Sequence, residues 1–434
     1  MRRILNAILA ISVFLIVLPG CGSTTHEGVV LGDERLESYL PRLEGKRVAI
    51  LSNQSGIVGD VVDGKPSRRE VTAESIDEPF LPFGSPSLGP HILDVLLEKG
   101  VDVKAVFSPE HGFRGLADPG ELVGDDRDAK TGVPVISLYK GGTMSIPDEV
   151  LDSFDILVVD IQDVGLRFYT YYITLQDIMA ICAVSGKEVL VLDRPNPNGF
   201  LVEGDILEEQ YYSSIGSIPV PTVHGMTLGE LALMMNGEGW LKDGLKCKLE
   251  VIPCLGYTHK TLYSLILPPS PNLKTMRSIY LYSTTCLFAG TVVSEGRGTG
   301  FPFEVYGHPD MTGQPFSFTP ESIPGATKPR FMGQTCHGRD LRDIPLDTLL
   351  ARGIDFRYVI DSYRNLGLGD SYFSFDSLGD HFELLTGTRR VREAIENADE
   401  DESPEALSAR IKAGWADEVA AFKDLRRKYL LYEE

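Results

Sequence analysis

The feature that most constrains the fold is a short apolar stretch followed by a polar turn, repeated through the first half of the chain. The most apolar of these stretches, residues 155–159 (DILVV), is nearly continuous, which is typical of a strand covered on both faces of a parallel sheet. Similar stretches lie at residues 46–51, 101–107 and 188–192, and helix-like segments separate them. This alternation predicts an α/β fold with a mostly parallel sheet.

Each of the four expected strands ends in polar, turn-forming residues. These ends read SNQSG (52–56), SPEHGFRG (108–115), DIQD (160–163) and DRPNPNG (193–199). Because the carboxyl ends of parallel strands meet at one edge of a sheet, we expect a polar pocket there. The residues expected to line it are Asn53, Glu110, His111, Asp160, Asp163, Arg167, Tyr169 and Asn196. Taken alone, the loop that carries Glu110, His111 and Arg114 is also compatible with a scaffold turn stabilised by a salt bridge.

Two motifs in the second half are further candidates. His224 precedes a segment in which Thr227 and Glu230 have the spacing of a helix capping box, so His224 lines the pocket or is a turn residue. Residues 291–303 form a glycine-rich loop that presents Glu295 and Arg297, and its glycines indicate either a ligand or close packing. A long amphipathic helix is expected over residues 403–429.

Length and charge limit the function classes. A chain of 434 residues with 43% apolar residues can bury two cores, and a net charge of −21 disfavours nucleic acid as a partner. The sequence contains no nucleotide-binding glycine motif, no zinc-binding spacing and no G-x-S-x-G motif. We therefore expect no cofactor and no metal.

The N-terminus resembles a lipoprotein signal peptide over residues 1–20. Arg2 and Arg3 precede an apolar run, and LPGC ends at Cys21, the expected site of lipidation, with residues 21–33 as a tether. An ordinary signal peptide or an uncleaved anchor is the alternative. Five further cysteines are expected to be buried and free, although a Cys247–Cys254 bridge is possible.

The motifs SNQSG, SPEHGFRG, DIQDVGLRFYTY, DRPNPNG, VHGMTLGELA, SPN, SEGRGTGFPFE and RRKYLLY resemble, in this order, those of the exo-β-N-acetylmuramidases of the NamZ type. The resemblance implies a Rossmann-like catalytic domain, assigned to residues 34–255 with a 60–90 insertion. It also implies a smaller mixed α+β domain, residues 256–434, that completes the cleft. The implied activity is release of non-reducing terminal N-acetylmuramic acid from peptidoglycan fragments, with Glu110 as the lead catalytic carboxylate.

Hydrolysis of a glycosidic bond commonly uses two carboxylates. Glu110 is a suitable acid if Phe107 and Phe113 exclude water from it. Asp160, Asp163 and Glu295 compete for the second role, and that group acts as base, as nucleophile or by orienting the substrate's acetamido group. Arg167 and Arg297 are the candidates to bind the lactyl carboxylate that distinguishes muramic acid. The alternatives are a glycan-binding lipoprotein without catalysis and, less favoured, an esterase or amidase using Ser52 or Ser55.

Overall fold

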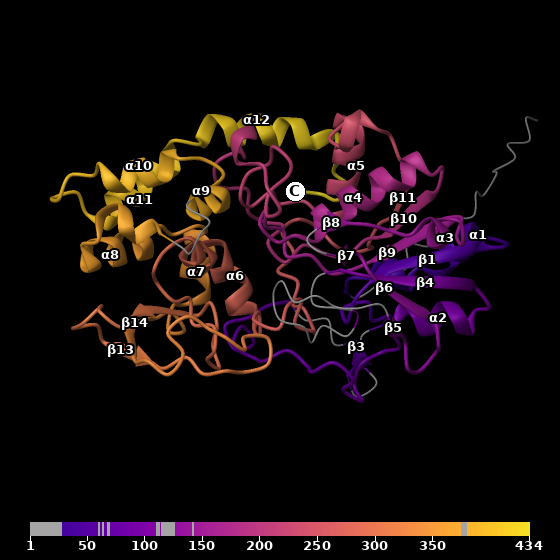
Figure 1. The fold of residues 1–434 in the computed structure, drawn as a ribbon, viewed down its shortest axis with the longest axis horizontal. Helices are drawn as coiled ribbons and strands as arrows, with labels where there is room; N and C mark the ends of the chain where they lie inside the picture. Colours follow the sequence, from indigo (N-terminus) through magenta and orange to yellow (C-terminus); the bar gives the residue numbers. More distant parts are fainter. Residues whose placement is uncertain are drawn as a thin grey trace, which may run out of the picture.

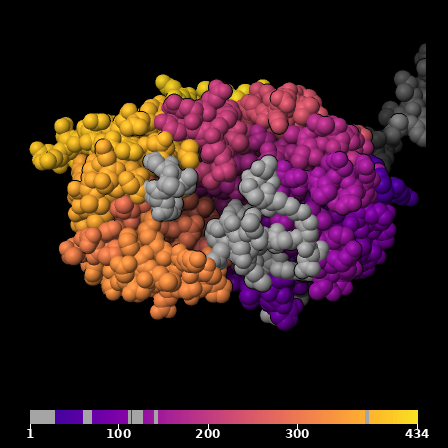
Figure 2. All heavy atoms as spheres, in the orientation of Figure 1, coloured from indigo at the N-terminus to yellow at the C-terminus, as the bar shows by residue number. Residues whose placement is uncertain are grey.

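The computed structural model describes residues 28–59, 61–62, 65–66, 70–109, 113, 126–140, 143–374 and 380–434. Two domains lie side by side in it (Figure 1), and their atoms pack against each other in the space-filling view (Figure 2). The N-terminal domain is built around a seven-stranded sheet, and the C-terminal domain combines helices with a three-stranded antiparallel sheet. The predicted α/β class with a smaller mixed domain is confirmed.

The large sheet has the strand order β11-β10-β9-β1-β4-β6-β5. Its six parallel strands follow the Rossmann order. The chain adds β4 and β6 on one side of β1 and then returns to add β9, β10 and β11 on the other side. The short strand β5 (Asp126–Arg127) pairs antiparallel with β6 at one edge. The parallel strands are β1 (Arg47–Ser52), β4 (Asp102–Ser108), β6 (Pro134–Ser137), β9 (Ile156–Asp160), β10 (Glu188–Leu192) and β11 (Lys248–Ile252).

Helices cover both faces of this sheet, as its apolar strands require. One face packs against α1 (Leu36–Leu43) and α2 (Ile92–Glu98). The other packs against α4 (Tyr171–Val184) and α5 (Leu228–Glu238), while α3 (Asp148–Leu151) precedes β9. Thr227 and Glu230 form the predicted capping box at the start of α5. Two short hairpins, β2–β3 (Val61–Val62, Lys65–Pro66) and β7–β8 (Tyr139–Lys140, Thr143–Met144), lie outside the sheet.

The C-terminal domain shares a hydrophobic core with the helical face that carries α4 and α5. Its sheet has the order β12-β14-β13. The strands are β12 (Val305–His308), β13 (Phe316–Phe318) and β14 (Cys336–Asp340). The helices are α6 (Met276–Thr285), α7 (Leu346–Arg352), α8 (Arg357–Leu366), α9 (His381–Thr386), α10 (Arg390–Glu396), α11 (Pro404–Ala413) and α12 (Ala416–Arg426).

The final helix differs from its prediction. Residues 403–429 form two helices, α11 and α12, because the backbone leaves the helical conformation at Trp415, which has φ −102° and ψ 2°. The interruption leaves both Trp415 and Phe422 buried. Figure 1 shows α12 leading back from the C-terminal domain towards α5.

Residues 28–33 are not a free tether, contrary to the sequence-based expectation. The Val30 and Gly32 amides donate to the carbonyls of Leu255 and Asp193, and Leu31 and Asp33 are buried. The segment therefore lies along the carboxyl edge of the sheet. Cys21, in the part of the chain before residue 28, lies outside the described residues.

The described part of the 60–90 insertion is attached to the chain that leads into the C-terminal domain. Val71 and Phe80 donate backbone hydrogen bonds to Leu262 and Lys274, and Arg277 forms an ion pair with Asp77 at 2.5 Å. The five cysteines after Cys21 are buried and free, so the Cys247–Cys254 bridge is not formed. None of the helices in the described ranges combines the length and apolar character needed to cross a bilayer.

Candidate active site

The carboxyl ends of β10, β9, β1 and β4 lie next to one another because these are neighbouring strands. At the centre, Ser52 of β1 is in register with Asp160 of β9. The order of the sheet reverses between these two strands, and open α/β sheets bind ligands at such a switch point. The prediction that four polar strand ends meet at one edge is confirmed.

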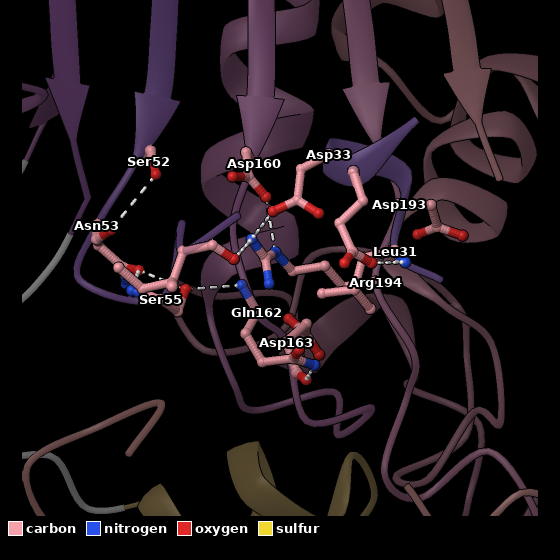
Figure 3. A network of polar contacts seen from close by, with 12 residues as sticks. Leu31, Asp33, Ser52, Asn53, Ser55, Asp160, Gln162, Asp163, Asp193 and Arg194 are labelled. Carbon is pink, nitrogen blue, oxygen red and sulfur yellow. Dashed lines mark hydrogen bonds and ion pairs between the residues drawn. The ribbon is translucent and has the colours of Figure 1, made fainter. Parts of the chain in front are cut away.

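The turn after β1 is a buried polar scaffold (Figure 3). The Asn53 amide nitrogen donates to the Tyr171 hydroxyl at 2.9 Å, and Asn53 Oδ1 accepts from both the amide and the hydroxyl of Ser55. Ser55 Oγ in turn accepts from the Gln162 amide at 3.0 Å. Asn53 thus connects the β1 turn to α4, and Ser55 connects it to the turn after β9, so neither side chain is free to bind a ligand.

Asp160 belongs to a buried ion network that sequence reasoning did not foresee. Arg194 donates to Asp160 Oδ1 and to Asp33 Oδ2, both at 2.6 Å, as Figure 3 shows. Both carboxylates are completely buried. The signal was present in part, since Arg194 lies in the DRPNPNG motif, but Asp33 lay in the expected tether. Asp160 is therefore bound by a cation and held away from solvent.

Asp163 is in a different state. Its Oδ1 accepts from the Gly165 amide at 2.7 Å, whereas Oδ2 has no hydrogen-bond partner among the described residues. Burial raises the pKa of Asp163 to about 7, although the amides of Gly165 and Val164 oppose the shift. A carboxyl group with this pKa exchanges its proton near neutral pH, as a general acid or base must.

Aromatic side chains connect this edge of the sheet to the C-terminal domain. The Tyr169 hydroxyl donates to the Pro269 carbonyl at 2.7 Å, and its ring packs edge-on against Tyr282 of α6 at 6.4 Å. Tyr282 in turn contacts Phe303, over which the Arg297 guanidinium lies at 4.9 Å. The aromatic cluster thus extends from Tyr169 to Arg297.

A cavity of about 540 Å³ opens beside this cluster in the C-terminal domain. Glu295 and Arg297 line it and form an ion pair at 2.5 Å, and Lys328 and Arg330 add positive charge. Burial acts to raise the pKa of Glu295, but the charges of Arg297 and Arg330 outweigh it, so the pKa falls below its usual value. The cavity therefore combines a charged carboxylate with three cations and suits an anionic group.

The comparisons with known proteins cover both domains. Family models described as the N-terminal and C-terminal parts of exo-β-N-acetylmuramidase NamZ match residues 84–277 and 280–432. The peptidoglycan β-N-acetylmuramidase NamZ of Bacillus subtilis is 36% identical over 418 residues, which cover 92% of this chain and 90% of that protein. The chain belongs to the NamZ exo-β-N-acetylmuramidase family.

Two solved structures of DUF1343 family proteins from Bacteroides fragilis have the same fold as this NamZ family member. One is 46% identical with a TM-score of 0.78, covering 94% of this chain and 99% of that chain. The other is 26% identical with a TM-score of 0.68, covering 93% of this chain and 99% of that chain. The similarity therefore extends over the whole two-domain arrangement.

Arg167, from the NamZ-like DIQDVGLRFYTY motif, is not placed to bind a substrate carboxylate. It is completely buried, and its guanidinium donates to the carbonyls of Asp205, Val220 and Leu385 at 2.7–3.0 Å. Burial lowers the pKa of Arg167 to about 10. The expected lactyl-binding role is therefore wrong for this residue, which instead holds three distant segments together.

Two other expected binding residues are also committed to the scaffold. Asn196 donates to the Met226 carbonyl at 2.9 Å and accepts from the Asn198 amide at 2.8 Å. His224 Nδ1 accepts from the Met226 amide, and burial with the nearby Arg426 and Arg167 charges lowers the pKa of His224 to about 3. His224 is therefore a buried turn residue, which is one of the two roles predicted for it, and it does not line a pocket.

Glu110, His111 and Arg114 of the SPEHGFRG motif lie outside the described residues. Phe107 and Phe113, expected to shield Glu110 from water, are both buried. Among the described residues, no group of three His, Cys, Asp or Glu side chains could hold a metal ion.

Proposed function

We propose that this protein is an exo-acting β-N-acetylmuramidase that releases non-reducing terminal N-acetylmuramic acid from peptidoglycan fragments. The observation that carries the proposal is the 36% identity to the Bacillus subtilis enzyme, which extends over 92% of this chain. The reaction breaks the bond between the anomeric carbon and the glycosidic oxygen. That oxygen takes a proton, and water supplies the hydroxyl on the released sugar.

Asp163 is the described carboxylate best suited to move that proton. Asp160 is paired with Arg194, and Glu295 is held ionised by Arg297, whereas Asp163 forms no ion pair among the described residues and has a pKa of about 7. We therefore assign Asp163 and Glu110 as the two catalytic carboxylates. Asp160 positions the turn that carries Asp163, and Arg297 binds the lactyl carboxylate.

The hydrogen bonds of the two serines argue against a serine esterase or amidase. The Ser52 hydroxyl donates to the Asn53 carbonyl, and the Ser55 hydroxyl donates to Asn53 Oδ1 at 2.6 Å. A serine nucleophile needs an adjacent base that takes its proton. A non-catalytic glycan-binding protein remains the second candidate, because the same sheet edge would bind a sugar without chemistry.

A sugar-release assay tests the proposal. The protein is incubated with the disaccharide MurNAc-GlcNAc, in which muramic acid is non-reducing, and with the reversed disaccharide GlcNAc-MurNAc. Free muramic acid from the first alone is the expected result, and Asp163→Asn and Glu110→Gln should each abolish it while leaving the fold intact. Binding of MurNAc-GlcNAc without any release would establish the glycan-binding alternative.

The proposed cellular location follows from the N-terminal sequence. Cleavage before Cys21 and lipidation of its thiol would attach the protein to a bacterial membrane after export, beside peptidoglycan. Metabolic labelling with a fatty-acid probe should mark the wild-type protein and not Cys21→Ala. Equal labelling of both proteins would refute the anchor.

A further inference from the structure

A second and larger pocket lies on the C-terminal domain. It has a volume of about 870 Å³, and its lining includes Lys274, Gly300, Phe301, Phe316, Glu321 and Arg342. An added Cβ at Gly300 would meet nothing within 4 Å, so the backbone there borders open space. The residues proposed to act on the scissile bond do not line this pocket.

One wall of the pocket is an aromatic surface held in place by an arginine. Phe316 contacts Phe301 edge-on and Phe318 in a stacked arrangement, each with ring centroids 6.1 Å apart. The Arg342 guanidinium lies 4.1 Å from the Phe301 ring centroid, and Asp340 holds it through two hydrogen bonds of 2.9 and 2.6 Å. A fixed and partly exposed aromatic face is suited to packing against the apolar face of a sugar ring.

Lys274 supplies a positive charge to the pocket. Its ammonium group has one acceptor, the Thr299 carbonyl at 3.3 Å, and forms no ion pair within the described part of the chain. Burial lowers the pKa of Lys274, while Glu304, whose carboxylate accepts a hydrogen bond from Thr275, opposes the shift. By contrast, Asp340 already balances the charge of Arg342. A half-buried ammonium with a single long hydrogen bond favours an anionic ligand.

The glycine-rich loop places this pocket next to the proposed active site. Glu295 and Arg297 line the 540 Å³ cavity, and the residues from Gly298 to Phe301 line the larger pocket. The Gly298 carbonyl accepts from the Glu321 amide at 2.8 Å, and the added Cβ at Gly298 would lie 2.5 Å from Pro329, which lines the smaller cavity. The loop is thus a thin partition between the two spaces.

We propose that the larger pocket binds a second muramoyl residue of the same glycan chain, two sugars beyond the scissile bond. Its lactyl carboxylate pairs with Lys274 and its sugar ring packs on Phe316 and Phe301. This inference rests on the proposed function, because alternating glycans place the next anionic sugar beyond one neutral N-acetylglucosamine. It predicts that longer fragments are preferred over the disaccharide.

Kinetics on two substrates test the pocket. Lys274→Met keeps the aliphatic stem and removes the charge, and Phe316→Ala removes the ring. Each should raise KM about fivefold or more for the tetrasaccharide MurNAc-GlcNAc-MurNAc-GlcNAc and leave KM for MurNAc-GlcNAc unchanged. Lys423→Ala, at an exposed position of α12, is the matched control and should alter neither. Equal changes on both substrates would overturn the proposal.

A binding measurement separates this proposal from the proposed catalytic function. GlcNAc-MurNAc carries no non-reducing muramic acid, so it should bind the wild-type pocket without being cleaved and should lose affinity in Lys274→Met. Neutral chitobiose should bind more weakly and be insensitive to that change. Gly300→Leu, which fills the open space, should also weaken binding of GlcNAc-MurNAc. If wild type cleaves MurNAc-GlcNAc but GlcNAc-MurNAc binding is unaffected by Lys274→Met and Gly300→Leu, the enzyme assignment stands and the pocket assignment is wrong.

Discussion

At the scale of single residues, the protonation of Asp163 connects catalysis with stability. The folded protein retains this proton up to about pH 7, whereas an unfolded aspartate loses it near pH 4. Between these values the folded state binds more protons, so the contribution of Asp163 to stability falls as pH rises. Relative to wild type, Asp163→Asn should gain roughly 1–4 kcal/mol in free energy of unfolding between pH 4 and pH 8.

Urea denaturation at both pH values measures this difference. Asp417→Asn, an exposed substitution on α12, is the control and should follow the pH dependence of wild type. If Asp163→Asn also parallels wild type across the range, the carboxyl group does not titrate near neutral pH. Its assignment as a proton-transfer residue would then fail.

The ion network of Asp33, Arg194 and Asp160 gives a second prediction at this scale. Removal of the shared cation leaves both buried carboxylates uncompensated, so Arg194→Met should lower the free energy of unfolding by about 3–5 kcal/mol. Glu250→Ala is the comparison, because it breaks an exposed ion pair in which the Glu250 side chain is 44% exposed and the Arg42 side chain is 59% exposed. This variant should lose at most about 1 kcal/mol of free energy of unfolding. Similar losses in the two variants would show that the network does not hold Asp160.

At the scale of elements, the glycine-rich loop depends on backbone conformation as well as on its charged residues. Gly298 has φ +83°, and an added Cβ would lie 2.5 Å from the Pro329 side chain, whereas Gly300 has neither constraint. Gly298→Ala should therefore lower stability by about 1–3 kcal/mol, and Gly300→Ala should be nearly neutral. Thermal melting of both variants provides the comparison, and a neutral Gly298→Ala would mean that the loop relaxes freely.

The elements also show what the sequence could reveal. Apolar strands with polar ends repeat locally, so the parallel sheet and the position of Asp160 and Asp163 at its edge were predictable. The burial of Arg167 was not, because its acceptors come from three separate segments, at Asp205, Val220 and Leu385. The break at Trp415 was not predicted, because the amphipathic pattern continues across it.

At the scale of the whole molecule, the C-terminal segment, residues 426–434, fastens the second domain to the first. The Tyr432 hydroxyl donates to Asp193 at 2.6 Å and accepts from the Cys254 amide at 2.9 Å. The Leu431 amide donates to Glu230 at 2.7 Å, and Arg426 donates to the Gly225 carbonyl at 2.6 Å. The C-terminal segment thus returns to the sheet domain, so the relative position of the domains is fixed by more than their shared core.

The hydrogen bonds between the C-terminal segment and the sheet domain predict that the two domains unfold together. Tyr432→Phe removes a hydrogen bond to a buried carboxylate and should lower the free energy of unfolding by about 1.5–3 kcal/mol, shifting one cooperative transition as a whole. Tyr212→Phe, at a residue that is 41% exposed, should leave the transition in place. Calorimetry distinguishes the possibilities. Two separate transitions in wild type, of which Tyr432→Phe moves neither, would mean that the C-terminal segment does not couple the domains and that the shared core alone holds the site together.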